Sequence, residues 1–265
     1  MGRLDGRTAL VTGASGGIGR EIARLLACEG ADLILVSRGL DTLEVVASEI
    51  TMECEHISTL LLSADLALPG AACGLWERIE RSGRTVDILV NSAGVGMFGG
   101  YADLDGAVEA AMLRLNIVSL TELTRLALPG MLERGFGHIL NVASTAAFQA
   151  VPYFTAYAAT KAYVLSYTEG LWGELTGTGV TATALAPGPT DTGFFDAANM
   201  RPSRNAGFLP PDQVGRLAIK AMLKGRPLVV TGILNRLLIL AARFAPRKLA
   251  TKISGTIMRS QLRES

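Results

Sequence analysis

Residues 7–19 read RTALVTGASGGIG, an apolar run that breaks into a glycine-rich turn. Gly13, Gly17 and Gly19 have the spacing G-x3-G-x-G, and a helical pattern follows over residues 18–29. Glycine between a strand and a helix lets backbone N–H groups approach a pyrophosphate, and the helix N-terminus adds partial positive charge. The stretch therefore predicts a dinucleotide-binding turn, with a glycine turn that binds no ligand as the alternative.

Short apolar runs alternate with helical patterns outward from this turn. Such an alternation predicts an α/β fold, and continuously apolar runs are typical of parallel strands buried on both faces. We expect a doubly wound, parallel, seven-stranded Rossmann-type sheet with helices on both faces. The predicted strands lie within residues 7–13, 31–38, 56–66, 86–94, 137–144, 180–188 and 226–232. The predicted helices span about 18–29, 40–52, 103–134 (interrupted at Pro129) and 153–175.

The composition indicates a folded chain with a sizeable core. Of 265 residues, 49% are hydrophobic and 18% are charged, which excludes a disordered chain. No charge-free window is long enough to predict a membrane span, and no leader is expected. We expect one catalytic domain over residues 1–232, with an extension over residues 233–265.

Three cysteines, Cys28, Cys54 and Cys73, form no C-x-x-C pair. An odd number without such a motif suits a reducing compartment. We therefore expect ordinary small apolar side chains and a cytoplasmic protein. No metal site is expected.

The charge is unevenly distributed along the chain. Residues 1–200 carry 12 basic and 22 acidic side chains (net −10), whereas residues 201–265 carry 13 and 2 (net +11). Residues 233–248 form an amphipathic helical pattern in which Arg236 and Arg243 share one stripe. Intramolecular packing, subunit contacts, a membrane surface or an acidic partner each suit this pattern. Nucleic acid is disfavoured because aromatic residues do not interleave with the charges.

Ligands of open α/β sheets bind at the carboxyl ends of the strands, so the residues that follow each strand are the candidates for binding a dinucleotide. Ser37 and Arg38 follow the second predicted strand, where a carboxylate would favour NAD. Asp32 lies at the opposite end of that strand. The Arg38 guanidinium suits a 2′-phosphate, so NADP (NADPH) is preferred, with NAD possible and a solvated surface arginine as the alternative.

Two further strand ends carry residues that suit the adenosine half of a dinucleotide. Asp65, followed by Leu66, offers a carboxylate to an adenine amino group, although such an Asp is also a common turn residue. Asn91, Ala93 and Gly94 form a small-residue turn that would let a cofactor pass close to the backbone.

Ser144, Tyr157 and Lys161 follow the fifth predicted strand. Tyr157 and Lys161 lie four positions apart (i and i+4), which places them on one helix face about 5–6 Å apart at Cβ. An ammonium beside a phenol stabilises the phenolate and lowers the tyrosine pKa toward neutrality, which suits general acid/base catalysis. Core packing with a lysine that extends to solvent is the alternative.

The sixth predicted strand ends at Pro187 and Gly188. Thr190 and Thr192 follow and would place hydroxyls near a nicotinamide carboxamide. A plain turn with a helix cap is the alternative.

The segments TGASGGIG, NSAG, RLN, NVAS, YAATK and PGPTDT occur in this order. Together they resemble the short-chain dehydrogenase/reductase family over roughly residues 5–195. The resemblance implies an NAD(P)-dependent enzyme in which Tyr157 is the general acid/base, Lys161 lowers its pKa and holds the ribose hydroxyls, and Ser144 orients the carbonyl. Ser92 departs from the family, which more often has a second Asn there.

The resemblance also assigns three further residues. Asn116 would hold a water in a proton relay to Lys161, and Ser15 and Ile18 belong to the cofactor-binding turn. A homodimer or homotetramer is implied as well.

The predicted substrate wall is apolar, which favours a small hydrophobic carbonyl or alcohol: a ketone, a 3-oxoacyl or a steroid-like compound. Residues 193–210, which include Pro202, read as an irregular substrate loop. The wall residues are Val95, Met97, Phe98, Phe148, Tyr153, Phe194 and Phe195.

Two other functions compete with this interpretation. One is a non-catalytic dinucleotide sensor on the same fold. The other is a hydrolase, because residues 13–17 also satisfy G-x-S-x-G. The hydrolase is disfavoured because the only histidines, His56 and His138, do not supply the base in the required position.

Overall fold

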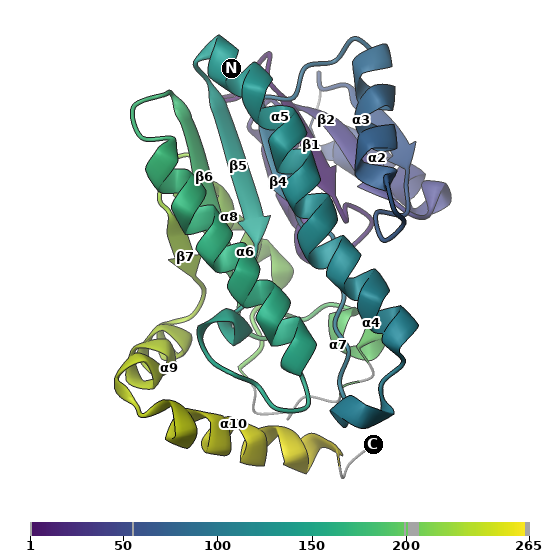
Figure 1. Cartoon of the computed structure of the whole chain (residues 1–265). Helices are drawn as coiled ribbons and strands as arrows, with labels where there is room; N and C mark the ends of the chain where they lie inside the picture. The colour runs from purple at the N-terminus through teal and green to yellow at the C-terminus, as the bar shows by residue number, and fades with distance from the viewer. Residues whose placement is uncertain (1, 55, 199, 201–206, 263–265) are drawn as a thin grey trace.

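The computed structural model describes residues 2–54, 56–198, 200 and 207–262, and its strands form one parallel sheet (Figure 1). The strand order is β3-β2-β1-β4-β5-β6-β7, and every neighbouring pair is parallel. This confirms the predicted doubly wound α/β fold. The strands are β1 (Thr8–Thr12), β2 (Asp32–Ser37), β3 (Thr59–Ser63), β4 (Ile88–Asn91), β5 (Gly137–Val142), β6 (Val180–Ala186) and β7 (Leu228–Val230).

Helices cover both faces of the sheet. One layer comprises α1 (Gly17–Cys28), α2 (Leu40–Glu53) and α8 (Pro211–Met222), which pack on alternate residues of the strands. The opposite layer comprises α3 (Ala71–Arg81), α5 (Leu120–Arg134) and α6 (Thr155–Glu174). The order reverses between β1 and β4, so these strand ends flank the switch point where ligands of such folds bind.

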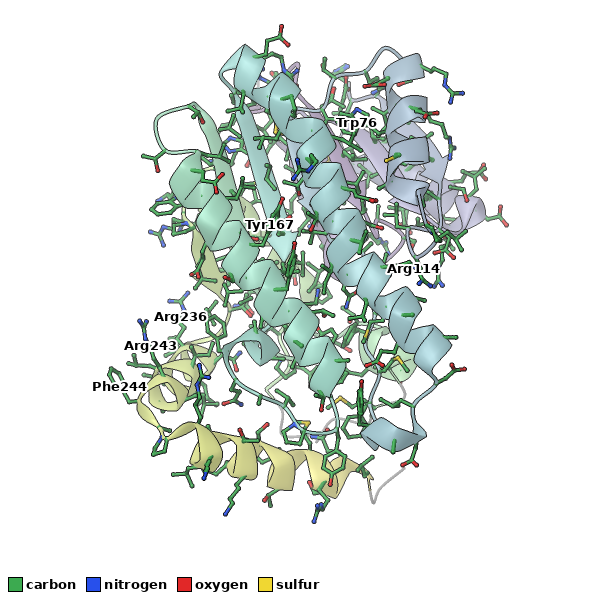
Figure 2. All side chains as sticks on the ribbon, viewed as in Figure 1. Trp76, Arg114, Tyr167, Arg236, Arg243 and Phe244 are labelled. Carbon is green, nitrogen blue, oxygen red and sulfur yellow. A yellow bond between two sulfur atoms is a disulfide. The ribbon has the colours of Figure 1, made fainter. Side chains whose placement is uncertain are left out.

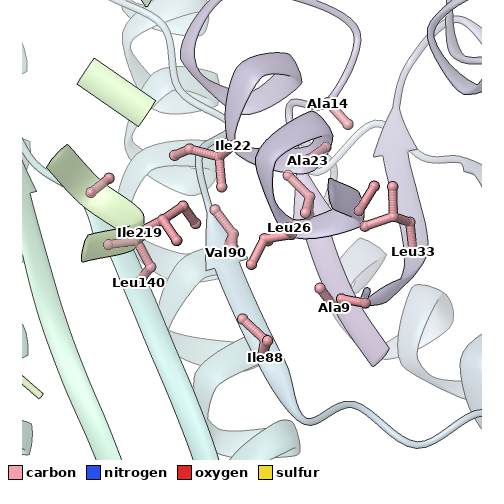
Figure 3. Packing of buried hydrophobic residues seen from close by; sticks show 14 of the residues in the cluster. Ala9, Ala14, Ile22, Ala23, Leu26, Leu33, Ile88, Val90, Leu140 and Ile219 are labelled. Atoms are coloured by element: carbon pink, nitrogen blue, oxygen red, sulfur yellow. The ribbon is translucent and has the colours of Figure 1, made fainter. Parts of the chain in front are cut away.

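Close packing holds α1 and α8 on the sheet. Ile22 and Leu26 of α1 lie among Val90, Leu140 and Ile219, all fully or almost fully buried (Figure 3). Because α1 begins in the glycine turn, this packing also fixes the position of that turn.

The helix predicted over residues 103–134 consists of several segments. A short turn (Tyr101–Asp103) precedes α4 (Gly106–Leu113), a π-helical segment (Arg114–Ser119) and α5. Pro129 does not interrupt α5, which continues to Arg134. A π-turn carries one extra residue and is frequent at functional sites.

The prediction that all three cysteines are ordinary small apolar side chains is wrong. Cys28 at the end of α1 and Cys54 after α2 form a disulfide, and Cys73 is free and exposed. Sequence spacing did not indicate the pair because the two residues meet only through the packing of α1 beside α2. The argument from cysteine usage for a reducing compartment therefore no longer holds.

The extension beyond residue 232 folds as two helices, α9 (Ile233–Phe244) and α10 (Arg247–Leu262). They lie across the end of the molecule where the strands have their carboxyl ends (Figure 1).

Candidate functional site

A cavity of about 910 Å³ lies at the carboxyl ends of the strands. Turns after β1, β2, β3, β4, β5 and β6 all contribute to its wall. Every predicted cofactor or catalytic residue lines it except Asn91 and Asn116. The lining set is Gly13, Ser15, Gly17, Ile18, Gly19, Ser37, Arg38, Asp65, Leu66, Ala93, Gly94, Ser144, Tyr157, Lys161, Pro187, Gly188, Thr190 and Thr192.

At Gly13 and Gly19, the turn after β1 has room for backbone only. A Cβ on Gly19 would lie 2.3 Å from the Gly13 carbonyl oxygen, and one on Gly13 would lie 2.9 Å from the Ala93 Cα. Gly13 also has φ +68°, which favours glycine. Gly16 caps α1 without a side-chain hydrogen bond, and Gly16, Gly17 and Ile18 line the cavity, so the N-terminus of α1 borders it. This cradle fits a pyrophosphate.

The tip of β2 presents one cation to the cavity. Ser37 Oγ donates to the Gly39 carbonyl, and the Arg38 carbonyl accepts from Ser63 Oγ, which orders the turn. Within the described part of the chain, no carboxylate forms an ion pair with the exposed Arg38 guanidinium. Arg38 is therefore available to an anionic group in the cavity.

The turn after β3 is held from the π-helical segment. Asp65 Oδ1 accepts the Ala67 N–H, while Arg114 Nε donates to the Ala67 carbonyl at 2.8 Å (Figure 2). Ser119 Oγ donates to the Leu66 carbonyl. Sequence reasoning missed Arg114 and Ser119 because nothing in the local pattern links them to a turn about fifty residues earlier.

Asn91 lies behind the cavity wall. Its Nδ2 donates to Asn141 Oδ1 at 2.9 Å and to Thr124 Oγ1 at 3.2 Å, and Asn141 Nδ2 donates to Thr168 Oγ1. These buried bonds join β4 and β5 to the helices that cover them. Of the predicted turn after β4, the structure brings Ala93 and Gly94 to the cavity and directs the Asn91 side chain away from it.

Ser144, Tyr157 and Lys161 converge from the end of β5 and the first turns of α6. Tyr157 lies close enough to Ser144 for the serine hydroxyl to lower the pKa of Tyr157, and Ser144 Oγ accepts the Ala146 N–H. Lys161 Nζ donates to the Val142 carbonyl at 2.7 Å and lies 5.8 Å from the centre of the Tyr157 ring. The three residues thus form one contiguous polar group in the cavity wall.

Burial dominates the acid–base properties of this group. Desolvation raises the pKa of Tyr157 to about 12, against a smaller lowering by the Ser144 hydrogen bond. Burial also lowers the pKa of Lys161 to about 8. The effect of the Lys161 ammonium on the pKa of Tyr157 stays a prediction; in this structure desolvation has the largest effect on that pKa.

Asn116 lies in the π-helical segment, one layer behind the wall. Its Oδ1 accepts the Val95 N–H, and its Nδ2 donates to the Val95 carbonyl and to Thr160 Oγ1. A Cβ on Gly94 would lie 3.2 Å from Asn116 Oδ1 and 3.4 Å from Lys161 Nζ, so both side chains reach the same backbone position. Asn116 is buried within this π-helical segment.

The remaining part of the cavity is apolar. Val95, Met97, Phe148, Phe194 and Phe195 line it as predicted, whereas Phe98 and Tyr153 belong to the packed cluster behind it. The structure adds apolar residues that sequence analysis missed: Met112, Val151, Phe154, Met200, Leu238, Ile239 and Met258.

The turn after β6 is ordered by its own hydroxyls. Thr190 Oγ1 donates to the Gly188 carbonyl, and Thr192 Oγ1 accepts the Phe194 N–H. A Cβ on Gly17 would lie 2.9 Å from Thr192 Cγ2, so the first and last turns of the site touch. In the predicted loop over 193–210, α7 (Phe194–Ala197) forms a short helix. Residues 199 and 201–206, including Pro202, lie outside the described residues.

The histidine positions speak against a hydrolase. His138 lies near the start of β5 and pairs with Thr181, at the end of the sheet opposite Ser15. His56 precedes β3, at that same opposite end.

Comparisons with known proteins agree with this geometry. Residues 7–202 match the family described as short chain dehydrogenase. The ketoacyl reductase HetN of Nostoc sp. is 32% identical over 223 residues, which cover 84% of this chain and 77% of that protein.

Two solved structures are similar over most of their length. A short-chain dehydrogenase from Sphingobium yanoikuyae in complex with NADPH has a TM-score of 0.80 at 28% identity and covers 89% of this chain and 93% of its own. A bulky-bulky ketone specific alcohol dehydrogenase from Comamonas testosteroni has a TM-score of 0.75 at 26% identity, and the match covers 89% of this chain and 92% of that chain. The motifs, the cavity and these matches together show that the chain belongs to the short-chain dehydrogenase family and is an NAD(P)-dependent oxidoreductase.

Proposed function

We propose that this protein interconverts a hydrophobic ketone and its alcohol with NADP(H) as cofactor, and that Tyr157 is the general acid/base. The single observation that supports this best is the shared cavity. The Ser144–Tyr157–Lys161 group, the glycine turn and Arg38 all line it, and most of its other lining residues are apolar. The NADPH bound by the Sphingobium relative supports the choice of cofactor, and the bulky ketone named for the Comamonas relative supports the substrate class.

The cavity wall divides into parts that suit the parts of NADP(H). The glycine turn and the N-terminus of α1 would hold the pyrophosphate, and Arg38 would pair with the 2′-phosphate. Thr190 and Thr192 would lie at the carboxamide. When bound, the nicotinamide supplies or accepts the hydride.

The protein's own residues position the carbonyl and handle the proton. The Ser144 hydroxyl orients the carbonyl oxygen, and the Tyr157 hydroxyl donates the proton to that oxygen as it gains electrons. Burial raises the pKa of Tyr157 to about 12, so its hydroxyl carries a proton at neutral pH, as the reductive direction requires. Lys161 then stabilises the phenolate left behind. Asn116 Oδ1 and Lys161 Nζ both lie beside the Gly94 backbone. In the oxidative direction Tyr157 accepts the alcohol proton.

Replacing Tyr157 with Phe tests the proposal. The variant keeps the ring that stacks on Phe154 at 4.3 Å, so NADPH binding is expected to remain while turnover falls by at least ~10²-fold. Turnover would be followed with bulky apolar ketones by NADPH absorbance, and binding by protein fluorescence. Phe replacement of the exposed Tyr101 is the control and should leave turnover unchanged. Undiminished turnover of Tyr157→Phe would refute the assignment. No observation in the structure favours a non-catalytic sensor.

A further inference from the structure

The helix α9 has an inner and an outer face of different character. Asn235, Ile239 and Ala242 line the cavity. The opposite side is apolar and exposed: Ile233 is 77% accessible and Phe244 is 81% accessible. Leu234, Leu237 and Leu240 continue that side, each more than half exposed. At 100° per residue these five residues occupy one arc of the helix.

The helix α10 repeats this arrangement. Ser254 and Gln261 are buried, and Met258 lines the cavity. Leu249, Ile253 and Ile257 follow one another at intervals of four residues, and each is about half exposed. The two helices therefore present apolar residues outward although most of the chain's large apolar residues are buried. Outward Ile, Leu and Phe in such number mark an interaction surface.

Cations accompany this apolar surface. Residues 233–262 contain six basic residues and no acidic one: Arg236, Arg243, Arg247, Lys248, Lys252 and Arg259. Arg243 extends from α9 near Phe244 (Figure 2), whereas Arg236 Nε donates to the Val230 carbonyl of β7 at 2.9 Å. Lys248, Lys252 and Arg259 form a row along α10 beside the apolar residues. Of these, Arg259 donates from Nε to the Tyr153 hydroxyl at 2.8 Å. Within the described residues none of the six forms an ion pair. The basic charge of this end is therefore uncompensated locally.

We propose that the outer face of α9 and α10 docks on an anionic membrane surface. Apolar side chains flanked by Lys and Arg characterise helices that lie in the membrane interface, where the apolar face enters the acyl boundary and the cations meet anionic headgroups. Among the described residues, no helix is long and apolar enough to cross a bilayer, so the contact is peripheral.

The charge distribution favours a lipid surface over a second copy of the chain. A two-fold contact through this face would place six cations against six cations. An anionic membrane instead attracts the extension and repels the body, whose residues 1–200 carry a net charge of −10. This polarity orients the molecule with α9 and α10 toward the lipid. The docked face and the cavity are then separated only by the thickness of these helices.

The test is sedimentation of the full-length protein with vesicles of phosphatidylcholine, with and without phosphatidylglycerol. We expect binding only to the anionic vesicles, weakened by salt. Arg243→Gln with Lys252→Gln should lower the partition coefficient roughly 25-fold, since each cation near such a surface contributes about fivefold. Leu237→Ser with Phe244→Ser should lower it at least about tenfold.

Matched controls carry the same changes elsewhere on the surface. Val45→Ser with Met52→Ser removes exposed apolar residues of α2, and Arg125→Gln with Lys220→Gln removes exposed cations of α5 and α8. Both should bind like the unchanged protein, and thermal unfolding should show that all variants fold.

Three results would overturn the proposal. The first is equal binding of the tail variants, and the second is absence of vesicle binding by the unchanged protein. The third is a loss of dimer mass in light scattering for Leu237→Ser with Phe244→Ser without lipid, which would make this face an interface between copies.

Discussion

Arg38 is the residue on which the proposed choice between the two dinucleotides depends. It lines the cavity, and no carboxylate of the described chain neutralises it. A guanidinium paired with a 2′-phosphate contributes about 1.5–3 kcal/mol. Arg38→Asp should therefore weaken NADPH binding by about 10- to 100-fold and improve NADH binding relative to it. Fluorescence titration of both nucleotides checks this, with Arg125→Asp as the control. Unchanged NADPH affinity would remove Arg38 from the site.

Lys161 makes a second prediction at this scale, on stability against pH. Its pKa is about 8 when folded and 10.5 when exposed, so the unfolded chain binds more protons between these values. Stability from this group therefore falls as the pH falls through 8 and is fully present above 10.5. We expect the free energy of unfolding to increase by about 1–3 kcal/mol between pH 7.5 and pH 10 because of this group, and Lys161→Met should abolish that increase. Denaturant titrations of both proteins at these pH values check it; identical pH dependence would contradict it.

At the scale of elements, the glycine turn determines how closely β1, α1 and β4 approach. A Cβ on Gly19 would meet the Gly13 carbonyl, which belongs to the backbone and cannot move cheaply. Gly19→Ala should destabilise the nucleotide-free protein by about 1–3 kcal/mol. Gly16→Ala in the same turn is the control, because a Cβ there meets nothing within 4 Å. Urea unfolding measures the stability of both variants, and equal stability would show that the turn accommodates a Cβ at Gly19.

The disulfide joins two elements of one layer. Cys28 and Cys54 close a loop with a sequence separation of 26 between the ends of α1 and α2. Reduction, or replacement of both by Ser, should cost about 3 kcal/mol of unfolding free energy through the freer unfolded chain. Cys73→Ser should change little, because Cys73 is exposed and free. Alkylation of all three thiols in the unreduced, denatured protein would show that the bond is absent.

At the scale of the whole molecule, the cavity depends on turns from most of the sheet at once. A dinucleotide that bridges them should stabilise the entire fold. At NADPH a hundredfold above its dissociation constant the gain is about 2.7 kcal/mol. For a chain of this size that raises the unfolding midpoint by roughly 5–10 °C. Calorimetric scans check it, with adenosine alone as the control. No shift at saturating nucleotide would mean that the turns do not act as one site.

Prediction from sequence succeeded where the deciding pattern involves residues that are close together in the chain. The seven apolar runs, the glycine spacing after β1 and the Tyr157–Lys161 interval each depend on residues close together in the chain. Parallel topology then brings the strand ends to one edge, so residues predicted one by one line a common cavity. Prediction failed for the pairing of Cys28 with Cys54. Nothing in the sequence indicated Arg114 beneath the turn after β3 or the inward direction of the Asn91 side chain. Each of these depends on which face of a distant element is turned toward it.

The sequence alone determined the fold class, the dinucleotide turn, the family resemblance and the uneven charge, because periodicity, glycine spacing and net charge are properties of the chain itself. Only the tertiary structure decided the cysteine pairing, the strong effect of burial on Tyr157 and Lys161, and the position of Asn116 beside Gly94. It also decided which face of α9 and α10 closes the cavity and which faces outward. These depend on distance and desolvation between segments far apart in sequence, which exist only once the layers have packed.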